Sequence, residues 1–161
     1  INLPSSLTSI GNYAFKGSGL TTVRIPESMA SIGYNAFDGC TSLTSIELPS
    51  TLTSISDNAF KGSGLESVKI PEGVESIEWG AFKGCASLAS IDLPSTLTSI
   101  SARVFAECTS LTDVYIRSLT PFYIFDPFPT TAKIYVPSES VEAYKKRWTE
   151  NAAQIVGYDY K

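Results

Sequence analysis

The sequence of 161 residues contains no histidine. This absence excludes Ser-His-Asp and Cys-His catalysis and any metal site built on imidazole. Only 17% of the residues are charged, and twelve basic against sixteen acidic side chains give a net charge of −4. Because this balance provides no basic face, we expect no nucleic-acid partner. No apolar run reaches about 18 residues, so the sequence predicts no transmembrane segment.

What the sequence does contain is an internal repeat. Proline recurs at positions 4, 26, 49, 71 and 94, and phenylalanine at 15, 37, 60, 82 and 105, so both recur at intervals of 22 or 23 residues. The intervals differ by one residue because Gly62-Ser63-Gly64 is one residue shorter than the matching segment Gly84-Cys85-Ala86-Ser87. A unit this short cannot fold alone, whereas stacked copies bury a shared core. The repeat therefore predicts a solenoid.

The pattern within each unit predicts its local structure. Residues such as Ser45–Leu48 alternate polar and apolar, which is typical of a strand, and the following Pro49 ends it. A second short extended segment follows at 53–55, and 57–62 is expected to form one helical turn that ends at glycine. We expect one parallel sheet and a right-handed superhelix. The predicted main strands lie near 22–25, 44–48, 67–70, 89–93 and 113–116.

Two stretches of the chain, LTSIELPSTLTSISDNAFKGSGL and LASIDLPSTLTSISARVFAEC, carry a family resemblance. At these positions the sequence resembles the BspA-like leucine-rich repeat family of bacterial surface proteins, closely over 1–111 and weakly to about 155. The resemblance implies a leucine-rich-repeat fold, secretion or display on a bacterial surface, and recognition of a protein or glycan. It implies no catalytic residue. We also expect no cofactor and no metal site.

The two ends of the chain differ from the regular units. We divide the chain into a solenoid over 1–137 and a C-terminal cap over 138–161. The solenoid includes a degenerate unit at 111–133, which carries Pro121, Pro127 and Pro129. The first residues enter in the middle of a unit, so we expect earlier coils and an export signal or anchor outside this fragment.

The cap is predicted to contain a helix over 138–148. Ser138 is its expected N-cap, and the basic residues 145–147 lie near its C-terminus, where they suit the helix dipole. Val141, Tyr144 and Trp148 share one apolar face. This face would cover the core of the last coil.

The three cysteines, Cys40, Cys85 and Cys108, occupy the same position of the repeat. Adjacent coils place Cys85 and Cys108 close enough for a disulfide. Serines 18 and 63 hold the matching positions in other units, however, so we expect small buried thiols.

The outward-facing row of the predicted sheet is the candidate binding surface. In sequence order it reads Arg24, Glu47, Lys69, Asp92, Tyr115 and Tyr135. The alternating charges predict cross-strand ion pairs. Alternatively, the row forms a binding surface with balanced charges that ends in two tyrosines. Glu47 and Asp92 could also lie at the separation of a glycosidase carboxylate pair, but Lys69 between them disfavours that reading.

Aromatic residues gather where this row ends. Tyr115 and Tyr135 are followed in the degenerate unit by Phe122, Tyr123 and Phe125, and interfaces favour such side chains. We expect these five to form the contact site, although they could instead pack the degenerate unit.

Three further aromatic residues, Tyr13, Tyr34 and Trp79, lie on the turns behind the sheet, where contact and local packing remain alternatives.

The sequence as a whole predicts a non-enzymatic interaction module that is secreted or displayed on a cell surface. Its expected partner is an extracellular protein or glycan, and we expect the module to be a monomer. The alternative is a structural spacer that displays another part of a larger surface protein.

Overall fold

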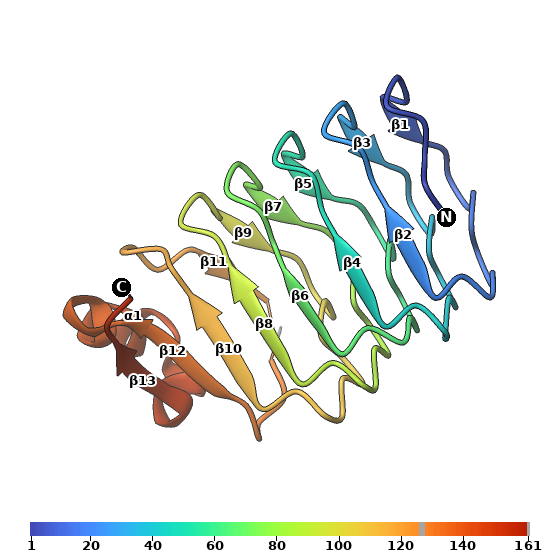
Figure 1. Ribbon diagram of the computed structural model, residues 1–161. Helices are drawn as coiled ribbons and strands as arrows, with labels where there is room; N and C mark the ends of the chain where they lie inside the picture. Colours follow the sequence, from blue (N-terminus) through green and yellow to red (C-terminus); the bar gives the residue numbers. More distant parts are fainter. Residues whose placement is uncertain (126–127, 161) are drawn as a thin grey trace.

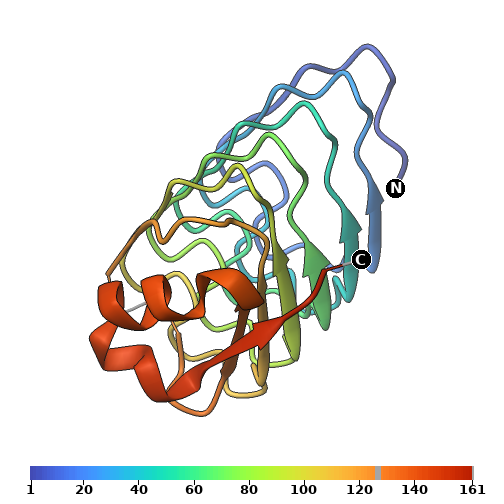
Figure 2. The same ribbon diagram turned by 90° about the vertical axis from the view of Figure 1, so that its left-hand side faces the viewer.

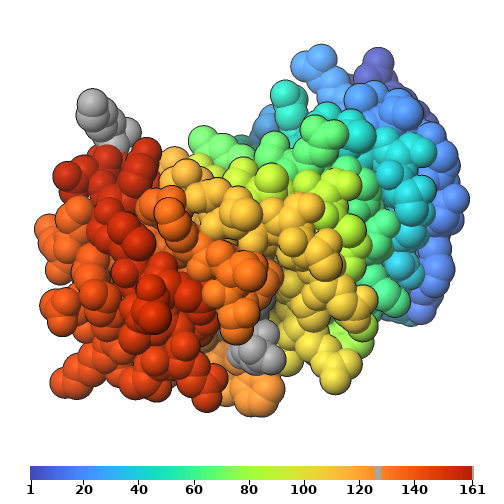
Figure 3. Space-filling model, turned by 90° about the horizontal axis from the view of Figure 1, so that it is seen from below, coloured from blue at the N-terminus to red at the C-terminus, as the bar shows by residue number. Residues whose placement is uncertain are grey.

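The repeated units form successive coils of one solenoid in a computed structural model that describes residues 1–125 and 128–160 (Figure 1). Pro127, expected in the degenerate unit, lies outside the described residues. Each regular coil contributes a main strand, a short second strand and a turn behind the sheet. Viewed from below, the coils pack from the first, in blue, to the cap, in red (Figure 3). The predicted solenoid of parallel strands is confirmed.

The main strands fall where the repeat predicted them. Their bounds are β2 (Thr22–Arg24), β4 (Ser45–Glu47), β6 (Ser67–Lys69), β8 (Ser90–Leu93), β10 (Asp113–Ile116), β12 (Lys133–Pro137) and β13 (Ile155–Tyr158). The single sheet that we expected is divided, because β2 and β4 pair with each other while the others run in the order β13-β12-β10-β8-β6. The division coincides with the shorter turn at Gly62–Gly64, which leads into β6.

Short second strands follow the prolines, as predicted. They are β1 (Ser9–Ile10), β3 (Ser31–Ile32), β5 (Ser54–Ile55), β7 (Ser76–Ile77), β9 (Ser99–Ile100) and β11 (Tyr123–Ile124). Four of them form a second parallel sheet in the order β11-β9-β7-β5, and β1 pairs with β3. In each regular coil the isoleucine of this strand is buried and the serine faces outward.

The turns behind the sheet are not the helical turns that we expected. They are successive tight turns because two residues in each have positive φ, for example Asn58 at 52° and Gly62 at 62°. This geometry lets the backbone pair from coil to coil: the Phe60 N–H donates to the Ala81 carbonyl at 2.8 Å. The phenylalanine rings stack with centroids 5.3–5.8 Å apart and close the core on this side.

The C-terminal cap lies across the end of the stack (Figure 2). It comprises a 3₁₀ turn η1 (Ser138–Ser140), helix α1 (Val141–Arg147), a 3₁₀ segment η2 (Thr149–Gln154) and β13. The expected helix over 138–148 is therefore shorter, and Ser138 makes no capping hydrogen bond because the chain first forms a 3₁₀ turn. Of the three residues of the expected apolar face, Tyr144 and Trp148 are buried and Val141 is partly buried. The strand β13 was not predicted.

All three cysteines are free and buried, as expected. Each thiol donates to the carbonyl of a phenylalanine on the preceding coil; for example, Cys85 Sγ lies 3.1 Å from the Phe60 oxygen. Ser63 Oγ lies 3.3 Å from Cys85 Sγ, so serine and cysteine continue one column.

Candidate functional site

The outward row of the main strands has the predicted register but not the predicted ion pairs. Arg24 lies opposite Glu47, and Lys69 opposite Asp92. Among the described residues, however, neither pair approaches to ion-pair distance. Exposed Arg24, Glu47 and Lys69 keep their charged ends in water, where such pairs gain little.

The ionic partner of Asp92 is Arg117, which follows β10 and which the sequence did not single out. The Arg117 guanidinium donates through Nε and Nη2 to the two carboxylate oxygens, each at 2.8 Å. This hydrogen bonding to Asp92 raises the pKa of Arg117. A bidentate pair of this kind fixes both side chains in one geometry.

Tyrosines cover the C-terminal part of the main sheet. Tyr115 and Tyr135 stack at 4.8 Å with an interplanar angle of 11°, because parallel pairing places them side by side. The Tyr158 ring meets both edge-on, at 5.5 and 5.8 Å. Tyr160 packs edge-on against Tyr158 at 4.8 Å. We call Tyr115, Tyr135, Tyr158 and Tyr160 the tyrosine patch.

A hydrogen bond and a cation–π contact stabilise the arrangement of the patch. The Tyr160 hydroxyl donates to the Tyr135 carbonyl at 3.0 Å, and the Arg117 guanidinium lies 5.0 Å from the Tyr160 ring centre. Partial burial raises the pKa of Tyr115 and Tyr160, and the neighbouring Asp113 carboxylate raises the pKa of Tyr135. These tyrosines are therefore neutral hydrogen-bonding groups at neutral pH.

A hollow beside the patch provides room for a ligand group. Its volume is about 480 Å³, and it is lined by Asp92, Tyr115, Arg117, Tyr158, Asp159 and Tyr160. Two of the predicted contact residues, Asp92 and Tyr115, thus face one hollow. The sequence signal that could have identified the other tyrosines is the alternation Tyr158-Asp159-Tyr160, which continues a strand-like pattern.

The other aromatic residues of the predicted contact site do not join the patch. Phe122 is buried, which corrects the expectation that it is presented to a partner; its ring packs edge-on against Trp148 at 5.2 Å. Tyr123 and Phe125 are 57% and 60% exposed. Tyr123 belongs to β11, which pairs with β9 in the second sheet, so it lies on a different surface.

The aromatic residues on the turns behind the sheet are exposed rather than part of the core. Tyr13 is 50% exposed, and Tyr34 and Trp79 are each 42% exposed. Tyr13 packs edge-on against Tyr34 at 5.0 Å, and Lys16 Nζ lies 5.5 Å from the Tyr13 ring centre. These contacts are local, since one joins neighbouring coils and the other lies within a single turn.

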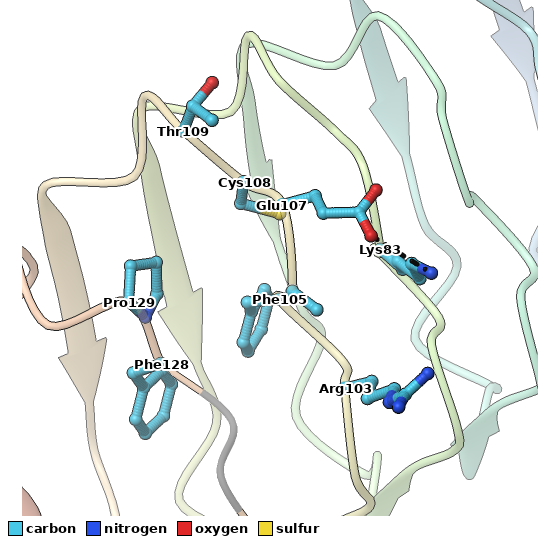
Figure 4. Close-up of a pocket in the computed structure, with 9 residues that line it drawn as sticks. Lys83, Arg103, Phe105, Glu107, Cys108, Thr109, Phe128 and Pro129 are labelled. Atoms are coloured by element: carbon cyan, nitrogen blue, oxygen red, sulfur yellow. Dashed lines mark ion pairs between the residues drawn. The ribbon is translucent and has the colours of Figure 1, made fainter.

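A second hollow, of about 510 Å³, lies between the last regular coil and the degenerate unit (Figure 4). Lys83 and Glu107 form an ion pair at 3.1 Å beside it, and Phe105 and Phe128 contribute aromatic walls. Cys108 also lines it, but burial raises the pKa of this thiol to about 12. The thiol is therefore protonated at neutral pH and is a poor nucleophile.

The described residues form neither a metal-ligating cluster nor a helix that could span a membrane. The parts of the chain that the structure describes bring together no group of three or more potential metal-ligating side chains. Among helices in residues 1–125 and 128–160, none has both the length and the apolar composition that crossing a bilayer requires.

Comparison with known proteins gives consistent results. The family model described as "BspA type Leucine rich repeat region" matches residues 8–128 in six copies. A leucine rich cell surface protein from Faecalibacterium prausnitzii A2-165 is 36% identical with a TM-score of 0.71, over 72% of this chain and 31% of that chain. The chain thus spans about a third of that relative. No curated protein matches the chain.

Two further solved structures resemble the chain over nearly its whole length. The T. pallidum leucine rich repeat protein TpLRR is 26% identical with a TM-score of 0.70, over 98% of this chain and 84% of that one. The pneumococcal vaccine antigen PcpA is 20% identical with a TM-score of 0.77, over 100% of this chain and 41% of that one, and shows the fold alone.

Proposed function

Because the chain belongs to the BspA type leucine rich repeat family, we propose that it is a non-enzymatic interaction module of a bacterial surface or secreted protein. Its partner is an extracellular protein or glycan. The similarity to a cell surface protein of Faecalibacterium prausnitzii supports this location. The observation that carries the binding role is the tyrosine patch, where three of the four tyrosines and the Asp92–Arg117 pair line one hollow.

The patch has the chemistry of a contact surface. Its rings form a preorganised cluster, since each is held by stacking, edge contacts or the hydrogen bond from Tyr160 to the Tyr135 carbonyl. A rigid aromatic surface with polar edges binds at a low cost in conformational entropy. The rest of the outward row is charged, which leaves the patch as the main aromatic surface of the main sheet.

A screen against arrays of glycans and of extracellular proteins would first identify a ligand. The double variant Tyr115→Ala, Tyr135→Ala should then lose at least about tenfold in affinity, or about 1.4 kcal/mol, while its circular dichroism spectrum is unchanged. The matched control, Tyr34→Ala with Trp79→Ala, removes exposed aromatic groups from the opposite turns. If only the control loses affinity, the contact site lies on those turns.

The alternative function is a structural spacer that displays another part of a larger protein. It is favoured by the regular stack and by the small share, 31%, of the F. prausnitzii protein that this chain spans. A spacer would bind nothing in either screen, and its surface tyrosines could be replaced without effect on the whole protein.

A further inference from the structure

The last strand of the main sheet, β13, leaves one edge unpaired. It pairs in parallel with β12 and stands at the end of the order β13-β12-β10-β8-β6. In Figure 2 it runs across the end of the stack nearest the viewer, with α1 beside it and no strand in front. An unpaired strand edge is a template for pairing with another chain.

The hydrogen bonds of the preceding coils show which groups face this edge. The Ile70 N–H donates to the Asp92 carbonyl at 3.0 Å, and the Leu93 carbonyl accepts from Arg117 N–H at 3.1 Å. The inward-facing residues of a main strand therefore direct their backbone groups toward the next coil. In β13 the residues at these register positions are Ile155 and Gly157, which lie opposite Ile134 and Val136.

Three backbone groups at this edge have no partner in the described part of the chain. The Ile155 N–H is used, because it donates to the Ala152 carbonyl. Outside the ladder with β12, no described residue bonds the Ile155 carbonyl or either backbone group of Gly157. The strand also carries no lysine or proline, the residues that commonly protect an edge from pairing.

The inner side of β13 packs against the cap, while its outer side is exposed to solvent. Ile155 is buried, and a Cβ at Gly157 would lie 3.2 Å from both Ser138 Oγ and Val141 Cγ2. The 3₁₀ turn and α1 therefore hold the strand closely from inside. Val156 and Tyr158 on the outer face are 41% and 43% exposed. The edge is thus preorganised, so a partner strand that pairs with it would cost this chain little conformational entropy.

Among the described residues, two carboxylates lie near the C-terminal end of the edge. Tyr158, Asp159 and Glu139 share a hollow of about 400 Å³. Arg117 also lines it, but this side chain is already neutralised by its bidentate pair with Asp92. Carboxylates beside an exposed tyrosine ring are a favourable environment for a lysine or arginine side chain.

We propose that the edge of β13 binds an extended, basic segment of a partner protein, which adds to the main sheet as its next strand. The proposal rests on the proposed interaction function and narrows its partner to a protein. The Gly157 N–H donates to a carbonyl of the segment, and the Gly157 and Ile155 carbonyls accept its N–H groups. Alternate basic side chains on the outer face then contact Tyr158 and the carboxylates of Asp159 and Glu139.

The first test uses short labelled peptides with the 161-residue chain. One peptide alternates lysine with valine, the second replaces every lysine with glutamate, and the third is the basic peptide with N-methylated backbone. We expect the basic peptide to bind at least about tenfold more tightly than either of the others in fluorescence anisotropy. It should also slow amide exchange at Gly157 in NMR spectra. Equal binding of the acidic or methylated peptide, or unchanged exchange at Gly157, would overturn the proposal.

Two substitutions of Gly157 distinguish the contribution of its free backbone N–H from the effect of added side-chain bulk. Gly157→Pro removes the outward donor without removing a bond to β12, whereas Gly157→Ala adds the same Cβ and keeps the donor. The proline variant should lose about tenfold in peptide affinity and the alanine variant little. Equal losses would assign the effect to crowding at Ser138 and refute the role of the donor. The double variant Glu139→Gln, Asp159→Asn should remove the preference for the basic peptide.

Two results distinguish this inference from the proposed function. If a screened ligand depends on Tyr115 and Tyr135 but is insensitive to Gly157→Pro, the interaction function stands and strand addition is wrong. A glycan ligand would give this result. If light scattering shows a dimer that Gly157→Pro dissociates, the edge binds a second copy of this chain, and the basic partner is wrong.

Discussion

Phenylalanine at one position of each unit fills the core behind the sheet. Phe60 is fully buried, and its ring lies 5.4 Å from the rings of both Phe37 and Phe82. The spacing of the coils is set by backbone bonds such as that from Phe60 N–H to the Ala81 carbonyl. A void between two such coils therefore cannot close by bringing them together.

The substitution Phe60→Ala should accordingly lower the free energy of unfolding by about 3–5 kcal/mol, through lost burial and the remaining cavity. Urea unfolding followed by circular dichroism would measure it. Phe125→Ala is the matched control, because this phenylalanine is 60% exposed and its removal should change stability by less than about 0.5 kcal/mol. Equal stability of wild type and Phe60→Ala would show that the phenylalanine column is not the core.

The buried thiols make stability depend on alkaline pH. Burial raises the pKa of Cys85, and it raises the pKa of Cys108 to about 12 from an ordinary value of 9.0. The folded state thus binds the proton more tightly than the unfolded state. Stability from this group is complete below about pH 9 and decreases as pH rises toward 12, because the unfolded state loses its proton first.

We expect Cys108→Ala to flatten this decrease relative to wild type between about pH 9 and 12, by up to about 4 kcal/mol. Chemical unfolding at a series of pH values would measure the slope. In the native protein at neutral pH, the three thiols should also react with a thiol reagent only on the timescale of unfolding. Parallel pH profiles, rapid labelling or a Cys85–Cys108 disulfide would each contradict this account.

The cap is held to the degenerate unit by two buried polar groups. The Tyr144 hydroxyl donates to the Ser118 carbonyl at 2.9 Å, and Trp148 Nε1 donates to the Phe122 carbonyl at 3.1 Å. These bonds satisfy carbonyls of a segment that lacks a regular ladder. The capping helix therefore supports the irregular coil as well as covering the apolar core.

Tyr144→Phe should lower the free energy of unfolding by about 1–2 kcal/mol, because it leaves the buried carbonyl oxygen of Ser118 without this hydrogen-bond donor. Tyr123→Phe is the matched control, because Tyr123 is 57% exposed. Thermal and urea unfolding of both variants would measure the difference. A Tyr144→Phe variant as stable as the control would mean that water replaces the hydroxyl, and that this hydrogen bond does not help to hold the cap.

In the 161-residue chain, the two ends of the stack are covered to different extents. The cap covers the last coil, while Leu3, Leu7, Phe15 and Leu20 of the first coils are only partly buried. In a solenoid each coil is stabilised by its immediate neighbours, so a coil with one neighbour opens more readily than one with two.

Amide hydrogen exchange should therefore be fastest in β1 and β2 and slowest in β6 to β10. Mass spectrometry of peptic fragments would measure this gradient. Uniform protection along the chain would show instead that the solenoid opens as one unit. An inverted gradient, with the cap exchanging first, would contradict the role assigned to Tyr144 and Trp148.

The sequence by itself determined where the elements of each coil lie, although not the type of turn behind the sheet. Each position in the repeat corresponds to one place in the coil, so the main strands, the buried Phe60 and the cysteine column could be located from spacing alone. The charged row from Arg24 to Asp92 was placed correctly for the same reason. Its ion pairs were predicted wrongly, because register fixes where a side chain starts and solvation decides where its charged end lies.

Only the tertiary structure decided the arrangement of residues that follow the regular units. Phe122 turns inward against Trp148, Arg117 reaches back to Asp92, and β13 returns to bring Tyr158 beside Tyr115. No period relates these residues, so their pairing depends on which surfaces remain uncovered after the coils have stacked. The candidate site forms at this end because the repeat stops there, and contacts between residues far apart in the sequence then decide where the side chains lie.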